Sequence, residues 1–150
     1  MNTLGGVSAR VLIGSAFGVT SPVPTRSPTL YIDLLLARGA KLELPAAWAE
    51  ERALYAVEGA CTIEGQPLAP QTMAVLPVGQ DVQLSADANM RCVLIGGAPL
   101  GQRFMWWNFV SSRKERIAQA AEAWAAQPNE TFPQVEGESE FIPLPERRPT

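Results

Sequence analysis

Few residues of this sequence could do chemistry, and histidine is absent from all 150 positions. An imidazole at a defined position is needed by Ser-His-Asp and Cys-His nucleophile pairs, two-histidine iron sites, HExxH zinc sites and a histidine general base. None of these sites can be built from this chain. The remaining candidates are thiols, carboxylates, a glycine-rich turn and a cluster of cations.

The two cysteines, Cys61 and Cys92, both lie inside apolar alternating runs. Two thiols far apart in the sequence, with no CxxC pair, make a poor set of metal ligands and no disulfide framework. A free thiol in such a run behaves as a small buried hydrophobe. We therefore expect two buried free thiols and, by default, a reduced cytoplasmic compartment.

A carboxylate pair and a glycine-rich stretch are the next candidates. Glu50 and Glu51 could supply one carboxylate to a cavity, but a solvated loop charge is the favoured interpretation. The stretch Gly96–Gly101 lacks the lysine of a phosphate-binding loop and is followed by aromatic residues. It is predicted to be a turn.

The cations Arg113, Lys114 and Arg116 lie within about one turn of a predicted helix. A nucleic-acid patch is one interpretation, but the formal net charge of -3 gives no electrostatic reason to expect nucleic acid. Cations at a helix N-terminus face the positive end of the macrodipole, which costs roughly a few tenths of a kcal/mol each. Such clusters are usually just exposed to solvent. Our hypothesis is that these cations contact an acidic surface nearby.

Length and composition indicate one globular domain. The chain is 47% hydrophobic and 18% charged, which predicts a packed core. No apolar run approaches the roughly 20 residues of a membrane span, so no membrane association is expected. The run Val11–Val19 is predicted to be a first strand and not a signal peptide, because glycines break it.

Short strands separated by turn residues fill the first two thirds of the chain. In Leu30–Leu36, every second side chain is a large aliphatic one, which predicts a strand with one wholly apolar face. The other expected strands are 8–13, 41–44, 54–57, 61–64, 72–76, 82–85 and 90–95. Such a series predicts a mainly β fold, an antiparallel sandwich or barrel. The stretch Ala46–Arg52 is left open between a helical turn and a loop.

One helix and an extended tail follow. Ser112 and Glu115 have the spacing of a capping box, which predicts that the helix spans 112–126. Its narrow apolar stripe comprises Ile117, Ala120, Ala121 and Trp124. The tail 127–150 alternates prolines with bulky apolar residues, so it is either a strap pinned to a surface or a frayed terminus.

Several stretches of the sequence resemble the C-terminal part of bacterial pirins. They are RFMWWNFVSSRKERIAQA (Arg103–Ala120), GGAPLG (Gly96–Gly101), EFIPLPE (Glu140–Glu146), VLIGSAFGVTSPVPT (Val11–Thr25) and the run Leu30–Pro45. The resemblance covers nearly the whole chain. Pirins have two cupin barrels of the RmlC-like jelly-roll type, and this chain is similar to the second. The resemblance implies a barrel over about 8–96, an aromatic strap over 97–111, then the helix and tail.

The resemblance also indicates where cupin metal ligands would stand. The first cupin motif, G, five residues, HxH, a short gap and E, reads from Gly39 to Pro45 and Ala47, with Glu51 or, for a longer gap, Arg52 at the acidic position. The second motif, PxGxxH, keeps its proline and glycine but has Val82 in place of histidine. We therefore expect no metal and no other cofactor. The iron site of pirins lies in the first cupin, so neither the quercetin 2,3-dioxygenase activity of some pirins nor their iron-dependent co-regulation is implied for this chain.

Association is the function that these features favour, without catalysis by the chain itself. The aromatic stretch places large rings on both sides of an extended segment, which a one-sided surface strand cannot bury. The expected interaction surface comprises Phe104, Met105, Trp106, Trp107, Phe109, Arg113, Lys114 and Arg116. The expected partner is a second copy of the chain or a separate first-cupin chain.

Two alternatives remain open. The first is a metal-dependent oxidoreductase of the quercetin 2,3-dioxygenase type. The second is a barrel that binds a small molecule in a cavity lined by Ala47, Val82 and Leu84. A stoichiometric metal would favour the first alternative.

Overall fold

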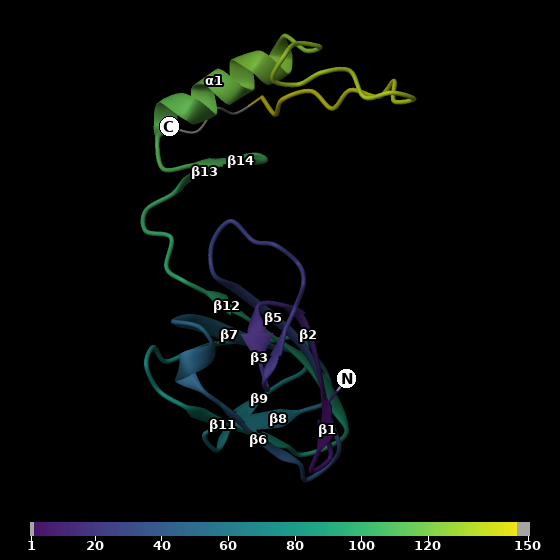
Figure 1. Cartoon of the computed structure of the whole chain (residues 1–150), viewed down its shortest axis with the longest axis vertical. Coiled ribbons are helices and arrows are strands. Elements are labelled where there is room, and N and C mark those ends of the chain that lie inside the picture. Colours follow the sequence, from purple (N-terminus) through teal and green to yellow (C-terminus); the bar gives the residue numbers. More distant parts are fainter. Residues whose placement is uncertain (1, 147–150) are drawn as a thin grey trace. The chain divides into compact units, whose positions relative to one another are not determined.

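The structure is a computed structural model that describes residues 2–146. It divides into two compact units, a first unit up to Pro99 and a second unit from Leu100 onward. Figure 1 labels most strands of the first unit, together with the two strands and the helix of the second. The boundary lies close to the predicted end of the barrel at about residue 96.

The two larger sheets of the first unit are antiparallel, with strand orders β1-β2-β5-β12-β7-β10 and β6-β11-β8-β9. The larger sheet comprises β1 (Asn2–Leu4), β2 (Val7–Ile13), β5 (Thr29–Leu36), β7 (Glu51–Glu58), β10 (Met73–Leu76) and β12 (Met90–Gly97). The smaller sheet comprises β6 (Lys41–Leu44), β8 (Cys61–Ile63), β9 (Gln66–Leu68) and β11 (Val82–Ala86). This arrangement confirms the predicted mainly β fold, as a sandwich of two sheets and not as a closed barrel.

Strand β5 lies near the middle of the larger sheet, between β2 and β12. Its side chains alternate as predicted: Ile32 and Leu34 have no exposed surface, whereas Tyr31 and Leu35 are exposed on the other face. Burying a side chain of this size stabilises the fold by about 1.5–3 kcal/mol. The period of two therefore determines which face of the sheet meets the core.

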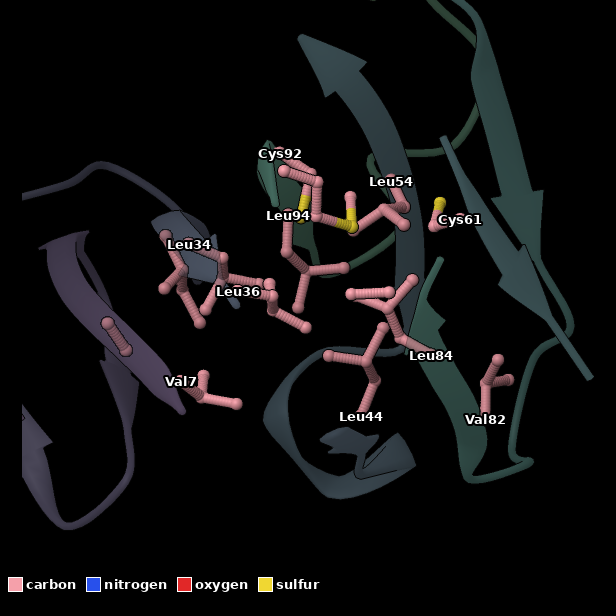
Figure 2. Packing of buried hydrophobic residues seen from close by; sticks show 14 of the residues in the cluster. Val7, Leu34, Leu36, Leu44, Leu54, Cys61, Val82, Leu84, Cys92 and Leu94 are labelled. Atoms are coloured by element: carbon pink, nitrogen blue, oxygen red, sulfur yellow. The ribbon is translucent and has the colours of Figure 1, made fainter. Parts of the chain in front are cut away.

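The core lies between the two sheets. In Figure 2, Leu34 of β5, Leu54 of β7 and Leu94 of β12 point toward Leu44 of β6 and Leu84 of β11. All five are completely buried. The two layers therefore share one aliphatic interior.

The prediction of two buried free thiols is confirmed, since Cys61 and Cys92 are both free and buried. Burial raises the pKa of the Cys92 thiol to about 12, and it also raises the pKa of Cys61. Both thiols are therefore neutral at ordinary pH and take part in packing.

Several short elements escaped the sequence pattern. The run Val11–Val19, expected as one strand, divides into the end of β2, then β3 (Ser15–Ala16) and the start of β4 (Val19–Thr20). The strands β1 and β9 were not predicted, and β9 contains Pro67. These short strands span only two or three residues each, which is too short to show a periodicity. The open stretch Ala46–Arg52 resolves into a 3-10 turn, η1 (Ala46–Trp48), followed by the start of β7.

The turn predicted over Gly96–Gly101 is wrong for its first two residues, because Gly96 and Gly97 belong to β12 and continue its pairing with β5 and β7. A Cβ atom at Gly96 would lie 2.5 Å from the carbonyl oxygen of Glu51, and one at Gly97 would lie 2.6 Å from that of Pro28. The glycines therefore permit close backbone approach inside the sheet, which a glycine in a strand often marks.

The second unit contains a hairpin and a helix: β13 (Phe104–Trp106), β14 (Phe109–Ser111) and α1 (Lys114–Ala125). The sequence predicted an aromatic strap without a reversal. The chain reverses at Trp107, whose φ of +51° lies in the left-handed region that few non-glycine residues adopt. No Gly-containing turn signal marks this hairpin.

The capping box predicted at Ser112 and Glu115 is not formed. The helix begins at Lys114, and its N-cap residue, Arg113, makes no side-chain capping bond. The Ser111 hydroxyl accepts instead from the Arg113 backbone N–H at 3.1 Å. Because β14 continues through Ser111, the helix starts later than the spacing suggested.

The tail is pinned at several points within the described residues. The Trp124 indole Nε1–H donates to the carbonyl of Ile142 at 2.8 Å, and the Phe141 ring stacks on Trp124 with centroids 6.2 Å apart. The pinned strap is therefore the better of the two descriptions up to residue 146. Residues 147–150 of the predicted tail lie outside the described residues.

Candidate functional site

The positions of the two degenerate motifs converge around one buried cation. Two residues were candidates for the acidic position of the first motif. Glu51 is exposed, whereas Arg52 points inward, with 3% of its surface exposed. The gap could not be read from sequence, because it depends on how η1 leads into β7. Arg52 is the residue that sequence reasoning left undecided, and it is the centre of the site.

Three backbone carbonyls accept hydrogen bonds from the Arg52 guanidinium. One Nη donates to Leu44 at 2.7 Å, and the other donates to Pro77 at 3.2 Å and to Gln80. Leu44 ends β6 directly before the first degenerate motif position, and Pro77 and Gln80 belong to the turn of the second motif. One side chain thus ties both motif segments together.

A second link runs between the same two segments. The Asp81 carboxylate accepts from the Ala46 backbone N–H at 2.7 Å. Its negative charge also favours the charged form of Arg52, whereas desolvation, the larger effect, lowers the pKa of Arg52 below its ordinary value. The Arg52 Nε is buried without a hydrogen-bond partner among the described residues.

Gly96 makes room for this arginine. A Cβ atom at Gly96 would lie 3.2 Å from the Arg52 Cγ, in addition to its approach to the backbone of Glu51. The sequence contained a signal for this close approach, an isolated Gly-Gly pair inside an apolar run. Such a pair is typical of close backbone approach as well as of a turn.

The chemistry of this site is that of a structural cation. A guanidinium has five donors and no acceptor, and it stays charged in proteins, so it offers no lone pair to a metal ion and no base to a substrate. Among residues 2–146, no group of three or more His, Cys, Asp or Glu side chains could hold a metal ion. The residues present at these positions do not fit a cupin metal centre.

The other predicted positions lie in different environments. Pro45 is half-buried and Ala47 is exposed. Val82 and Leu84 are 1% and 0% exposed and belong to the aliphatic core. Ala47 is therefore exposed to solvent, whereas Val82 and Leu84, which were expected to line a cavity with it, lie in the core.

The predicted interaction surface lies in the second unit, and part of it packs within that unit. The Trp107 ring meets Phe109 and Trp124 edge to face, with centroids 5.5 and 5.1 Å apart. Phe132 packs against Trp124 at 5.1 Å and against Phe109 at 6.2 Å. This aromatic cluster combines residues from the hairpin, the helix and the tail. No local sequence pattern predicts this combination.

A groove between β13 and α1 holds the rest of the predicted surface. It has a volume of about 580 Å³, and its lining includes Phe104, Met105, Trp106 and Ile117. Met105 is 72% exposed. The Lys114 ammonium lies 5.1 Å from the centroid of the Phe104 ring, a cation–π contact that holds one predicted cation beside the groove.

The remaining cations of the predicted surface, Arg113 and Arg116, are exposed. No ion pair joins Arg113, Lys114 or Arg116 to an acidic side chain in the part of the chain that the structure describes. The hypothesis of an acidic surface that answers them stays a prediction. No helix within residues 2–146 is long and apolar enough to cross a membrane.

Comparison with known proteins gives consistent results. The family described as the pirin C-terminal cupin domain matches residues 31–130. A pirin-like protein of Caulobacter vibrioides is 42% identical over 142 residues, which cover 95% of this chain and 48% of the relative. Pirin of Mus musculus is 37% identical over 125 residues, covering 79% of this chain and 43% of the relative.

A solved structure, quercetin 2,3-dioxygenase from Acinetobacter baumannii, is also similar. It superposes with a TM-score of 0.81 at 25% sequence identity, covering 99% of this chain and 51% of that protein. The chain thus spans about half the length of the relatives that it matches.

Proposed function

Because this chain belongs to the pirin family and corresponds to its C-terminal cupin domain, we propose that it is a metal-free domain that acts through association and catalyses no reaction itself. The proposal has two parts, the lack of a metal and the use of an apolar surface. They are supported by different regions of the chain and tested separately.

The buried Arg52 guanidinium supports the metal-free part. It donates to carbonyls of both degenerate motif segments, so a positive charge already links the segments that a metal would link. A divalent cation nearby would be repelled, and the chain has no histidine to compensate. Pro45, Ala47 and Val82 offer no ligand atoms in their side chains.

Elemental analysis tests this part directly. The chain should be purified without a histidine tag, incubated with ferrous iron or copper, and desalted before analysis. We expect far less than one metal ion per chain. A stoichiometric metal that survives desalting would contradict the metal-free proposal.

The groove beside α1 supports the association part. Met105, 72% exposed, and the half-buried Phe104 and Trp106 present apolar surface where a partner would cover it. Exposed apolar patches of this kind mark interaction sites in soluble proteins. The partner is a second copy of the chain or a separate first-cupin chain.

Light scattering coupled to size exclusion tests association. We expect a mass above the 16.2 kDa of one chain, or a complex when a first-cupin chain is added, and a loss of either with Met105→Glu. Val135→Glu is the matched control, because Val135 is 66% exposed but does not line the groove. A monomer that also ignores a first-cupin chain would contradict this part.

The similarity to a quercetin 2,3-dioxygenase structure favours one second candidate, a metal-dependent oxidoreductase of that type. It requires a bound metal, so the elemental analysis decides between the two. A metal-loaded chain that oxidises quercetin would establish the second candidate and overturn the first.

A further inference from the structure

The outer face of the larger sheet carries an apolar row. The register aligns Ile13 of β2 with Tyr31 of β5, Tyr31 with Ile95 of β12, Ile95 with Ala53 of β7, and Ala53 with Val75 of β10. Directly paired residues share a face of the sheet. The row therefore crosses five neighbouring strands without a charged side chain.

This row faces away from the core. The residues next to it along each strand, such as Ile32, Leu54 and Leu94, point inward and are fully buried. In the row itself, Val75 is 83% exposed and Tyr31 is 36% exposed. An antiparallel sheet with one face on the core normally shows polar residues on the other, whereas this outer face holds its charged pair Arg10 and Asp33 beside the apolar row and not within it.

A charged corner borders the apolar row. Asp33 pairs with Arg10 of β2 and with Val93 of β12 in the register, and its carboxylate accepts a bidentate contact from Arg91 at 2.8 and 3.1 Å. Arg10 is exposed and makes no ion pair within the described residues. The corner thus carries both signs of charge, with one cation available to a partner.

The size of the face suits a small interface. Five strands about 4.8 Å apart, and about six residues of 3.3 Å rise along each, cover about 480 Å². Two such faces together cover about 960 Å², which is below the roughly 1,600 Å² total of a standard interface and falls in the class of weak, transient complexes under about 1,200 Å².

We propose that the outer face of the larger sheet, from β2 to β10, is a contact at which a second copy of this chain packs sheet on sheet. A two-fold interface needs a patch that is complementary to itself. An apolar row meets this requirement against its own copy, and a corner with both charge signs lets Arg10 of one copy approach Asp33 of the other. The contact lies in the first unit, so it goes beyond the groove of the proposed function.

The test is the monomer–dimer equilibrium measured by sedimentation velocity over a dilution series. The wild-type chain is expected to reach twice its 16.2 kDa mass, with a Kd on the order of micromolar. Val75→Glu should weaken the dimer at least about tenfold, because it places an unpaired charge in the contact. Val78→Glu, at a residue 62% exposed in the turn after β10, should change the Kd by less than about twofold.

Two further variants separate this inference from the groove. Arg10→Glu should weaken the dimer, and Arg10→Lys should restore most of the affinity. A dimer that withstands Val75→Glu but is lost with Met105→Glu would overturn the sheet contact and leave the groove proposal intact. A chain that stays monomeric at every concentration would overturn the sheet contact, while capture of a first-cupin chain would still support the groove.

Discussion

The two units bury their apolar residues in different ways. In the first unit, aliphatic side chains such as Leu34, Leu54 and Leu94 are completely buried between two sheets. In the second unit, α1 buries only Ile117, and the aromatic rings of Trp107 and Trp124 stay half-buried. Two sheets can cover each other's inner faces, whereas one hairpin and one helix supply too few layers to enclose the rings.

This difference bears on function. A closed aliphatic core has little left to offer a partner from its interior, so the first unit can associate only through its outer faces. The second unit keeps partly exposed rings and a groove of about 580 Å³, which an additional layer could cover. The following variants test this contrast between the two cores.

The largest effect is expected for Leu34→Ala. Deleting a fully buried leucine side chain removes apolar contact and leaves a cavity, so the free energy of unfolding should fall by about 3–5 kcal/mol. Denaturant unfolding, followed by far-ultraviolet circular dichroism of the strands, measures it. The control is Leu35→Ala on the outer face of the same strand, which should cost less than about 1 kcal/mol at concentrations where the chain is monomeric. Equal effects would contradict the assignment of faces.

Arg52→Met should have the next largest effect. It removes a buried cation and leaves three carbonyls without their donor, so we expect a loss of about 2–4 kcal/mol in unfolding free energy. Arg52→Lys should recover part of this loss, because an ammonium can still donate to some of the carbonyls. If Arg52→Met is as stable as wild type, the guanidinium does not tie the two motif segments together.

Phe132→Ala tests the aromatic cluster of the second unit. The ring contacts Trp124 and Phe109 but is half-buried, so the loss should be about 1–2 kcal/mol. Near-ultraviolet circular dichroism should report the loosened packing of the tryptophans. Thr131→Ala, at the exposed neighbouring residue, is the control, and an equal change there would argue against the cluster.

The smallest effect concerns pH and belongs to the first unit, which holds both thiols. The Cys92 pKa rises from 9.0 to about 12 on folding, so the folded chain keeps a proton that the unfolded chain loses in alkali. Stability should therefore be unchanged by this group below about pH 9 and fall by about 1 kcal/mol between pH 9 and 10. Urea unfolding at both pH values measures the slope, and Cys92→Ala should reduce it, leaving the part that comes from the raised pKa of Cys61. A variant with the wild-type slope would rule out Cys92 as its cause.

Local periodicity predicted the strands that matter most for the core. The alternation in Leu30–Leu36 is complete within the strand, so it needed no information about partners. The capping box failed because the competing strand β14 extends to Ser111 and delays the helix. A long apolar repeat is enough to predict that a helix exists, whereas the first residue of the helix depends on where the preceding strand ends.

For the candidate site, the sequence predicted only which cupin metal ligands are missing. The motif comparison located Pro45, Ala47 and Val82 as positions without ligands, because residue types are read directly from the sequence. It left the acidic position between Glu51 and Arg52, since the choice depends on η1 and on the phase of β7. That phase turns Arg52 inward, where it donates to carbonyls at the end of β6 and in the turn after β10.

The sequence by itself determined the mainly β fold, the buried thiols and the lack of cupin ligands, because each depends on residue types and short-range periodicity. Tertiary structure alone decided that the sheets form a sandwich, that Arg52 links the end of β6 to the turn after β10, that rings from the hairpin, helix and tail form one cluster, and that an apolar row crosses five strands. These features depend on strand register and on contacts between residues far apart in the chain. Neither is encoded in any single stretch of the sequence.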